Sequence, residues 1–179
     1  PGSCDTTFTV DITAPAPLQV AAVITPPSCN GDCTGSIEVD ATGGNGVFSY
    51  SWSPPPGDGQ GTATASLLCA DTYTVLITDP AGCDTTVTYT VTEPTALTLD
   101  LSATDSHCAV CDGSATAVTA GGTGAGGIVW TDATNTVVGN GAGIPGLCAG
   151  TYTATATDAS GCSVQAQVVV QDADGEVLS

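Results

Sequence analysis

Cysteine is the residue type in this chain with the widest chemical repertoire, because its sulfur can form a disulfide, bind a metal or act as a redox centre. The sequence has nine cysteines among 179 residues. Since this number is odd, at least one thiol lacks a partner within the chain. The positions are Cys4, Cys29, Cys33, Cys69, Cys83, Cys108, Cys111, Cys148 and Cys162.

A zinc site is one alternative, because His107 stands directly before the cysteine pair Cys108 and Cys111. The related pair Cys29 and Cys33 has a wider spacing and no histidine beside it. Zinc needs a fixed ligand set, and a thioredoxin-like centre would need a βαβ pattern that the sequence lacks. We therefore expect disulfides, which also support small cores in proteins outside the cytosol.

The pairing is constrained by the strand ends that the cysteines occupy. Cys33 opens one predicted strand, and Cys69 leads into another that starts at the same end of a sandwich, so we expect a Cys33–Cys69 bond. By analogy, Cys111 pairs with Cys148. Each bond contributes about 3 to 4 kcal/mol in the chain-entropy treatment of disulfides.

Cys29 and Cys83 form the obvious remaining pair, with Cys108 and Cys162 as their counterparts. A Cys29–Cys83 bond is difficult to reach, because the four residues from Cys33 to Cys29 span only about 14 Å when extended. A strand of about 23 Å separates Cys83 from the other end of the sandwich. A disulfide between adjacent units therefore remains an open alternative.

The charge balance excludes several functions. The chain has no Lys or Arg and 18 Asp and Glu residues, which gives a formal net charge of -18. Nucleic acids and anionic membranes are bound mainly through Lys and Arg, and no apolar run is long enough to insert into a membrane. With one histidine, no lysine for Schiff-base chemistry and no nucleophile elbow, the sequence predicts no enzyme and no bound cofactor.

The carboxylates offer two weaker possibilities. Asp79 and Asp158 each precede a glycine-containing turn, where an aspartate usually bonds to local backbone, so we expect a structural role for both. Residues 172–176 contain three acidic residues that could hold Ca²⁺, which prefers several oxygen ligands. The stretch is too short for an EF-hand, and a solvated tail is the alternative that we favour.

These residues recur because the chain repeats itself at an offset of 79 residues. Cys29 matches Cys108, and the sequence that begins at Cys4 returns at Cys83. The repeat predicts four parts: a terminal strand of a preceding repeat (1–14), a first repeat (15–93), a second repeat (94–172) and a tail or next linker (173–179).

Within each repeat, apolar and polar residues alternate with a period of two, which is typical of β-strands. Six or seven short strands per repeat predict an all-β chain of Greek-key sandwiches. Proline-containing segments 13–17 and 92–96 predict short, stiff linkers. The strands of the first repeat are expected at 18–24, 36–40, 47–52, 62–67, 73–77 and 87–91.

Aromatic residues occupy core positions of this pattern. Trp52 and Trp130 fall on a central strand, and Tyr73 and Tyr152 open the strand that faces it. We expect these side chains to be buried and to bind nothing.

Both repeats resemble the SprB repeat, a module of very large surface adhesins of gliding bacteria of the Bacteroidota type. The resemblance covers nearly the whole chain. It rests on the ordered motifs Cys29-Asn30-Gly31, Gly43-Gly44, Tyr50-Ser51-Trp52-Ser53, Leu68-Cys69-Ala70-Asp71-Thr72-Tyr73 and Asp79-Pro80-Ala81-Gly82-Cys83, and on Gly121-Gly122, Leu147-Cys148-Ala149-Gly150-Thr151-Tyr152 and Asp158-Ala159-Ser160-Gly161-Cys162 in the second repeat.

The resemblance implies immunoglobulin-like or PKD-like sandwiches, secretion by the type IX route, a place at the cell surface in gliding motility, and a structural or adhesive role as a stalk or extracellular filament. The expected partners are other repeats of the chain or other copies in a filament, with surface polysaccharide and Ca²⁺ as further candidates. A carbohydrate-binding module and the passive stalk of an extracellular enzyme are the alternative functions. Thr6 and Thr85 also resemble O-glycosylation sites of those bacteria.

Overall fold

The chain consists of β-strands joined by turns. The structure, a computed structural model, describes residues 2, 4, 6–107, 110–124 and 126–173, and within these residues it contains thirteen strands and no helix. The strands form four antiparallel sheets. None of the described residues lies in a helix long and apolar enough to cross a membrane. The predicted all-β class is therefore confirmed.

The first six strands form one sandwich, which we call the first sandwich. One sheet has the order β1-β2-β4, and the facing sheet has the order β3-β5-β6. This is the order of an immunoglobulin-like fold without its strand D: β1, β2 and β4 take the places of strands A, B and E, and β3, β5 and β6 those of C, F and G. The bounds are β1 (Gln19–Thr25), β2 (Gly35–Thr42), β3 (Ser49–Ser53), β4 (Thr64–Leu68), β5 (Asp71–Thr78) and β6 (Asp84–Val91).

The remaining seven strands form the second sandwich with the same topology. Its sheets have the orders β11-β8-β7 and β10-β9-β12-β13. The added edge strand, β10, follows a turn at Asn135, whereas the first repeat has the proline-rich segment 54–56 in that region. The bounds are β7 (Thr98–Thr104), β8 (Gly113–Ala120), β9 (Gly127–Asp132), β10 (Val137–Asn140), β11 (Gly143–Leu147), β12 (Gly150–Thr157) and β13 (Ser163–Val170).

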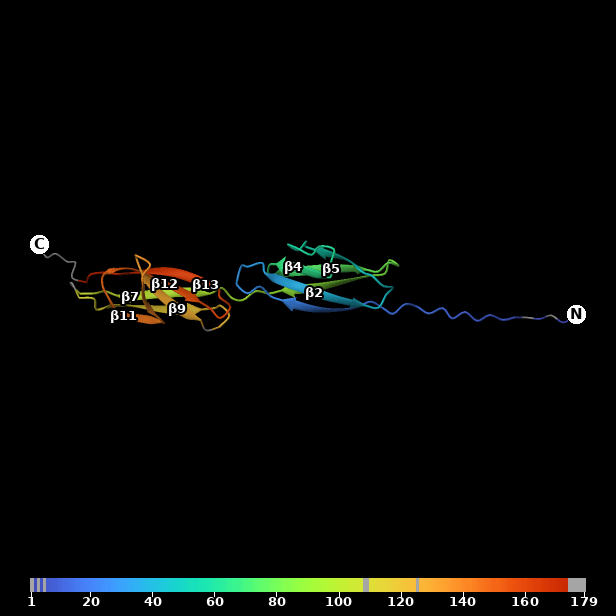
Figure 1. The fold of residues 1–179 in the computed structure, drawn as a ribbon, viewed down its shortest axis with the longest axis horizontal. Coiled ribbons are helices and arrows are strands. Elements are labelled where there is room, and N and C mark those ends of the chain that lie inside the picture. Colours follow the sequence, from blue (N-terminus) through green and yellow to red (C-terminus); the bar gives the residue numbers. More distant parts are fainter. Residues whose placement is uncertain (1, 3, 5, 108–109, 125, 174–179) are drawn as a thin grey trace.

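Each sandwich has its own hydrophobic core. Trp52 is 2% exposed in the first cluster, and Trp130 is fully buried in the second. Every second residue of β5 and β12 points inward, which is the consequence of the period of two. The burial predicted for both tryptophans and for Tyr73 and Tyr152 is confirmed. Figure 1 shows the two sandwiches one after the other along the long axis, joined by a single linker.

The N-terminal segment differs from the sandwiches. Residues 6–18 form no strand, and Figure 1 shows this segment leading away from the first sandwich. Its apolar residues are exposed: Phe8 by 85%, Val10 by 79% and Ile12 by 93%. The strand expected from residue 47 also begins later, at Ser49, because the turn continues through Gly46, whose φ of 105° is left-handed.

Tyr73 and Tyr152 form a tyrosine corner in each sandwich, a feature of immunoglobulin-like folds. The Tyr152 hydroxyl donates a hydrogen bond to the carbonyl oxygen of Cys148 at 3.0 Å, and the Tyr73 hydroxyl donates to Cys69 at 3.3 Å. Each bond lies at the crossing from one sheet to the other, at the cysteine whose disulfide partner leads into the neighbouring strand, β2 or β8.

Replacing Tyr152 by phenylalanine is expected to lower the free energy of unfolding by about 1 kcal/mol, because the partly buried hydrogen bond to the carbonyl oxygen of Cys148 is lost. Urea unfolding followed by fluorescence measures this change. Tyr50→Phe, on the half-buried face of β3, is the matched control and is expected to change stability by less than about 0.5 kcal/mol. An equal effect of both substitutions would contradict the role of the corner.

Candidate functional site

The most distinctive feature of the molecule is a disulfide between the two sandwiches. Cys29, in the loop between β1 and β2, is bonded to Cys162, in the turn between β12 and β13. Their Cα atoms are 5.6 Å apart, although 133 residues separate them in sequence. We use the term junction for the region formed by the loop 28–33, the linker 92–97 and the turn 158–162.

This bond corrects the expected Cys29–Cys83 pair and, because it occupies Cys162, the expected Cys108–Cys162 pair as well. Cys29 lies near Cys33, whose bond to Cys69 places it at the start of β5. Cys83 follows the end of β5, and the eight residues of that strand span about 26 Å. The two ends of the first sandwich are therefore too far apart for a Cys29–Cys83 bond, and Cys29 instead reaches the next sandwich.

The turn that carries Cys162 is organised by Asp158, which is 6% exposed. Its Oδ1 accepts hydrogen bonds from the backbone N–H groups of Ser160 and Cys162, both at 2.9 Å. Its Oδ2 accepts from the N–H of Thr123 at 2.9 Å, which ties the turn to the β8–β9 loop. Gly161 takes a φ of 86°, a conformation that favours glycine. Asp158 therefore sets the position of the bonded cysteine, as its expected structural role requires.

The same contacts set the acidity of Asp158. Desolvation raises the pKa of its carboxyl group, but the backbone hydrogen bonds from Thr123, Cys162 and Ser160, with a side-chain bond from Thr123, outweigh it and hold the pKa below its ordinary value. Folding therefore favours the ionised carboxylate. No cation is needed to hold this charge, because several N–H dipoles point at it.

Replacing Asp158 by asparagine is expected to weaken the dependence of stability on pH. Because the folded pKa lies below the unfolded value of about 3.9, the ionised carboxylate contributes stability above that pH. This contribution is lost as the pH falls through the folded pKa, so the variant should show a flatter decrease of the melting temperature below about pH 4. Asp100→Asn, at an exposed position of β7, is the control. Parallel curves for the variant and the parent chain would contradict the role of Asp158.

The loop that carries Cys29 is held by Glu93, in the linker. Asn30 Nδ2 donates to Glu93 Oε1 at 2.9 Å and to the carbonyl oxygen of Pro94 at 3.0 Å. The N–H of Gly31 donates to Glu93 Oε2 at 2.6 Å. This carboxylate was missed by the sequence analysis, although its place at the repeat boundary next to a proline was the signal that could have indicated it.

The other end of the linker is held by the second sandwich. The N–H of Gly122 donates to the carbonyl oxygen of Thr95 at 3.0 Å. Gly121 has a φ of 73°, and a Cβ atom at this position would collide with the carbonyl oxygen of Ala96. Only glycine fits there. Close packing against the preceding linker therefore explains the Gly121-Gly122 motif, and likewise Gly43-Gly44 in the first repeat. The linker is thus attached to both sandwiches, on either side of the disulfide.

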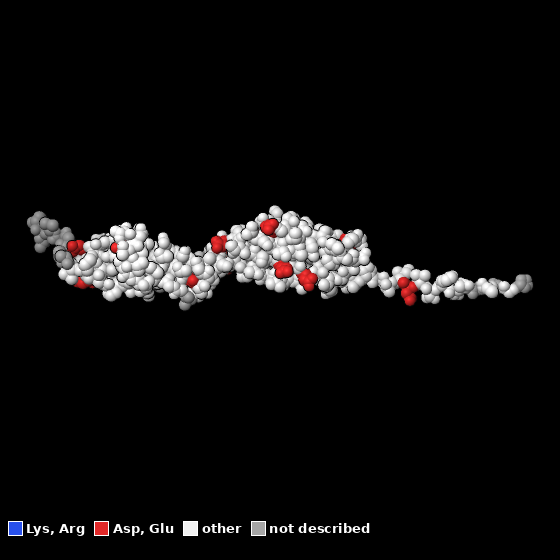
Figure 2. Space-filling view, in the orientation of Figure 1, with Lys and Arg blue, Asp and Glu red and all other residues white. Residues whose placement is uncertain are grey.

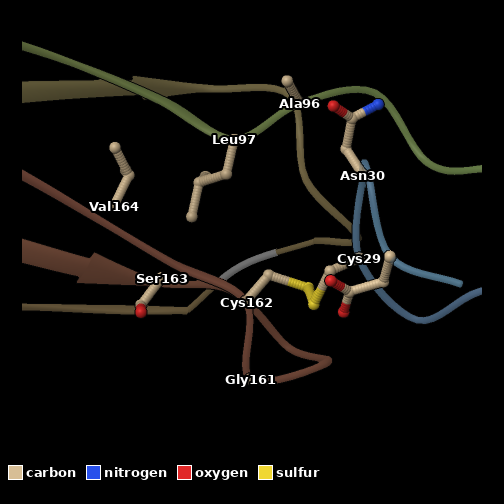
Figure 3. A pocket seen from close by; sticks show the side chains of 9 residues that line it. Cys29, Asn30, Ala96, Leu97, Gly161, Cys162, Ser163 and Val164 are labelled. Atoms are coloured by element: carbon tan, nitrogen blue, oxygen red, sulfur yellow. A yellow bond between two sulfur atoms is a disulfide. The ribbon is translucent and has the colours of Figure 1, made fainter. Parts of the chain in front are cut away.

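An open hollow of about 410 Å³ lies beside the disulfide. Figure 3 shows Leu97 and Val164 along one side and the amide of Asn30 and the Cys29–Cys162 bond on the other. Cys162 Sγ also lies 3.3 Å from the carbonyl oxygen of Ser28, which is a contact because an oxidised sulfur has no proton to donate. Among the described residues, the lining supplies one carboxylate, that of Asp32.

The other predicted cysteine sites lie within the sandwiches. Cys33 is bonded to Cys69 and Cys111 to Cys148, each at one end of its sandwich beside two paired strands of the same sheet. Cys108 lies outside the described residues. Cys4 and Cys83 are exposed, and neither is bonded to another cysteine that the structure describes.

The histidine of the zinc alternative is engaged elsewhere. His107 Nδ1 lies 2.9 Å from Asp112 Oδ2, and its backbone N–H donates to Asp112 Oδ1 at 2.9 Å. This backbone bond, with the histidine side chain, holds the pKa of Asp112 below its ordinary value. Since Cys111 is oxidised, it cannot serve as a thiolate ligand. Within the described part of the chain, no cluster of His, Cys, Asp and Glu could hold a metal ion.

The remaining candidates are separate from the junction. Thr6 is exposed in the N-terminal segment, and Thr85 is half-buried at the start of β6. Glycosylation of either stays a prediction. Of the acidic tail, residue 172 pairs with Ser106 in a short parallel bridge, and residues 174–176 lie outside the described residues.

The surface charge is dispersed. Figure 2 shows acidic side chains scattered over the visible face of both sandwiches and the N-terminal segment, with no basic residue. The alternative of a carbohydrate-binding platform would need exposed tryptophans, and both Trp52 and Trp130 are instead in the cores.

Comparison with known protein families finds the SprB repeat at residues 21–57. This segment runs from β1 past β3 and contains Cys29, Cys33 and Trp52. The resemblance to the SprB repeat family is therefore confirmed. The comparison with curated proteins gives no match.

Among solved structures, the chain is similar to immunoglobulin-domain proteins. The crystal structure of DIP-gamma IG1+IG2 is 12% identical, with a TM-score of 0.41, over 87% of this chain and 97% of that one. Mouse nectin-like molecule 4 is 17% identical, with a TM-score of 0.36, over 92% and 67%. A structure described as the basis for Dscam isoform specificity is 14% identical, with a TM-score of 0.39, over 88% of this chain, which spans 46% of that one. Because these TM-scores are low, the immunoglobulin-like fold is assigned from the sheet topology alone.

Proposed function

We propose that this chain, whose residues 21–57 match the SprB repeat, is a segment of an extended repeat array that serves as a structural or adhesive stalk, or as a filament, at the surface of a cell. The observation that carries the proposal is the Cys29–Cys162 disulfide. A covalent bond between successive sandwiches serves no catalytic purpose, but it resists bending and pulling at the weakest point of a repeat array.

The second support is the way in which the linker is held. Glu93 anchors it to the first sandwich, and Gly122 anchors it to the second. Adjacent domains joined by a free linker move relative to each other by default. Two hydrogen-bonded attachments and a disulfide oppose that motion, so the sandwiches behave as one stiff rod.

We assign the parts of the array as the repeats suggest. Residues 15–93 form one repeat and 94–172 the next, while 1–14 supply the last strand of a preceding repeat and 173–179 are a tail or the start of the next linker. The exposed alternating residues Phe8, Val10 and Ile12 support this assignment, because they correspond to Val87, Tyr89 and Val91 of β6, which pack toward the first core.

Disulfides and the SprB repeat support a place outside the cell, since disulfides persist in oxidising compartments. Type IX secretion and a part in gliding motility belong to the same proposal. Other repeats of the chain, or other copies in a filament, are the proposed partners.

Electron microscopy of the native surface material tests the proposal. We expect thin fibres or stalks that antibodies against this chain label along their length, with a spacing set by the repeat. Labelling of compact particles in the medium, with no label on the cell surface or on fibres, would contradict a structural role. Binding of the purified chain to a glycan array would instead favour the carbohydrate-binding alternative.

A further inference from the structure

The first sandwich presents a turn with the same geometry as the turn that carries Cys162. Asp79 is 5% exposed, and its Oδ1 accepts hydrogen bonds from the N–H groups of Ala81 at 2.9 Å and Cys83 at 2.8 Å. Asp79 Oδ2 accepts from the N–H of Asn45 at 3.1 Å. Gly82 has a φ of 85°, against 86° for Gly161. The backbone of Cys83 is therefore held by the same contacts as that of Cys162.

The surroundings of Cys83 also match the second half of the junction. The N–H of Gly44 donates to the carbonyl oxygen of Ala16 at 2.8 Å, as Gly122 does to Thr95. Leu18 is half-buried, like its counterpart Leu97 beside the Cys29–Cys162 bond. The end of the first sandwich that faces the N-terminal segment thus repeats the surface that the second sandwich offers to Cys29.

The segment before the first sandwich has the length that this arrangement needs. Ile12 corresponds to Val91, the last residue of β6, and Gln19 corresponds to Thr98, the first residue of β7. The linker from a preceding last strand to β1 therefore has the same number of residues as the linker at the junction. A preceding repeat would meet the first sandwich at the same spacing.

We propose that Cys83 forms a disulfide with a cysteine of a preceding SprB-like repeat, at the position equivalent to Cys29, so that every junction of the array is closed by one bond. This inference rests on the proposed function, because it takes the chain to be part of a repeat array. It makes Cys83 one half of a covalent docking surface whose occupant is the loop that opens the second strand of the preceding repeat.

One contact differs at that junction. Ala14 stands at the position of Glu93, so no carboxylate holds the loop of the preceding repeat there. Pro15, at the position of Pro94, retains the backbone carbonyl that accepts from the loop. The disulfide is consequently the main attachment of this junction besides the chain itself.

Formation of this disulfide needs an oxidant that accepts two electrons, and an external disulfide, such as that of oxidised glutathione or of a disulfide oxidoreductase, supplies it. The thiolate of Cys83 attacks this disulfide, forms a mixed disulfide and releases one thiol. The thiolate of the preceding repeat then attacks the sulfur of Cys83 and releases the second thiol. Two protein thiols have lost two electrons and two protons, and one external disulfide has been reduced to two thiols.

A chain with one inserted repeat tests the inference. A copy of residues 15–93 is placed after residue 14, and this copy carries Cys83→Ser so that only one Cys83 remains. The chain is refolded with oxidised glutathione, alkylated without reductant and cleaved before aspartate. Cys83 then lies on peptide 79–83, and the inserted Cys29 lies on a peptide with the sequence of 11–31, made of residues 11–14 and the start of the copy. We expect these peptides to be linked, and alkylation of Cys83 to fall about tenfold below that in the parent chain.

The inference would be overturned if Cys83 is free, or is bonded to Cys4, in an insertion chain that does contain the Cys29–Cys162 bond. X-ray scattering of the same sample separates this failure from failure of the proposed function. A rod that is longer by one repeat but has a free Cys83 would contradict the proposed disulfide and still support the repeat array. A compact particle would contradict the array itself. If the insertion chain does not fold, the same mapping of the full polypeptide from its source decides, because Cys83 must there be linked to a cysteine that precedes residue 1.

Discussion

Replacing Trp130 by alanine is expected to lower the free energy of unfolding of the second sandwich by about 3 to 5 kcal/mol. The side chain is fully buried, and its Nε1 donates to the carbonyl oxygen of Gly141 at 2.9 Å. The loss should lie at the upper end of this range because the core around it is built from small residues. Ala115, Ala117 and Ala154 stand where the first sandwich has Ile37, Val39 and Val75.

Each sandwich contains one tryptophan, so the remaining residue reports on the other core. In Trp130→Ala, the fluorescence of Trp52 should show the first sandwich unfolding at nearly its original denaturant concentration, while circular dichroism shows the second unfolding earlier. Val129→Ala, on the partly exposed side of β9, is the control and should cost less than about 1 kcal/mol. An equal shift of both sandwiches would contradict two separate cores.

Replacing both Cys29 and Cys162 by serine is the second change with a large expected effect. A disulfide that joins residues 133 apart restricts the unfolded chain strongly and contributes about 5 kcal/mol in the chain-entropy treatment. We expect the free energy of unfolding of the whole chain to fall by about this amount. X-ray scattering should also show a broader distribution of interatomic distances, since the linker becomes the main connection between the sandwiches.

Cys83→Ser is the matched control, because Cys83 occupies the equivalent turn of the first sandwich and is bonded to none of the described cysteines. Its stability should differ from that of the parent chain by less than about 0.5 kcal/mol. A loss below about 1 kcal/mol in the double variant, with an unchanged scattering profile, would show that the bond does not hold the sandwiches together.

The local elements could be predicted from the sequence because their causes are local. The period of two defines the strands, and glycine, proline and aspartate define the turns between them. Trp52 and Tyr73 were placed in the core from their strand positions, and the structure buries both. Strand β10 had no counterpart in the first repeat, so the comparison of repeats could not indicate it.

The junction could be predicted only in part, because it depends on how two sandwiches face each other. The lengths of the Cys29–Cys33 segment and of the strand before Cys83 allow a bond between adjacent units. They do not decide whether Cys83 or Cys162 is the partner of Cys29. That choice depends on the linker, which Glu93 and Gly122 hold in one position. A hydrogen bond between Glu93 and a loop 62 residues away leaves no periodic signal in the sequence.

The most direct test of this account is a map of the disulfides in the unreduced chain after cleavage before aspartate, which suits a protein without Lys or Arg. The cleavage separates Cys29, on peptide 11–31, from Cys33, on the peptide that begins at Asp32. The account predicts that peptide 11–31 is linked to peptide 158–171, which carries Cys162. A link between peptides 11–31 and 79–83, which would close Cys29 onto Cys83 within one sandwich, would contradict it.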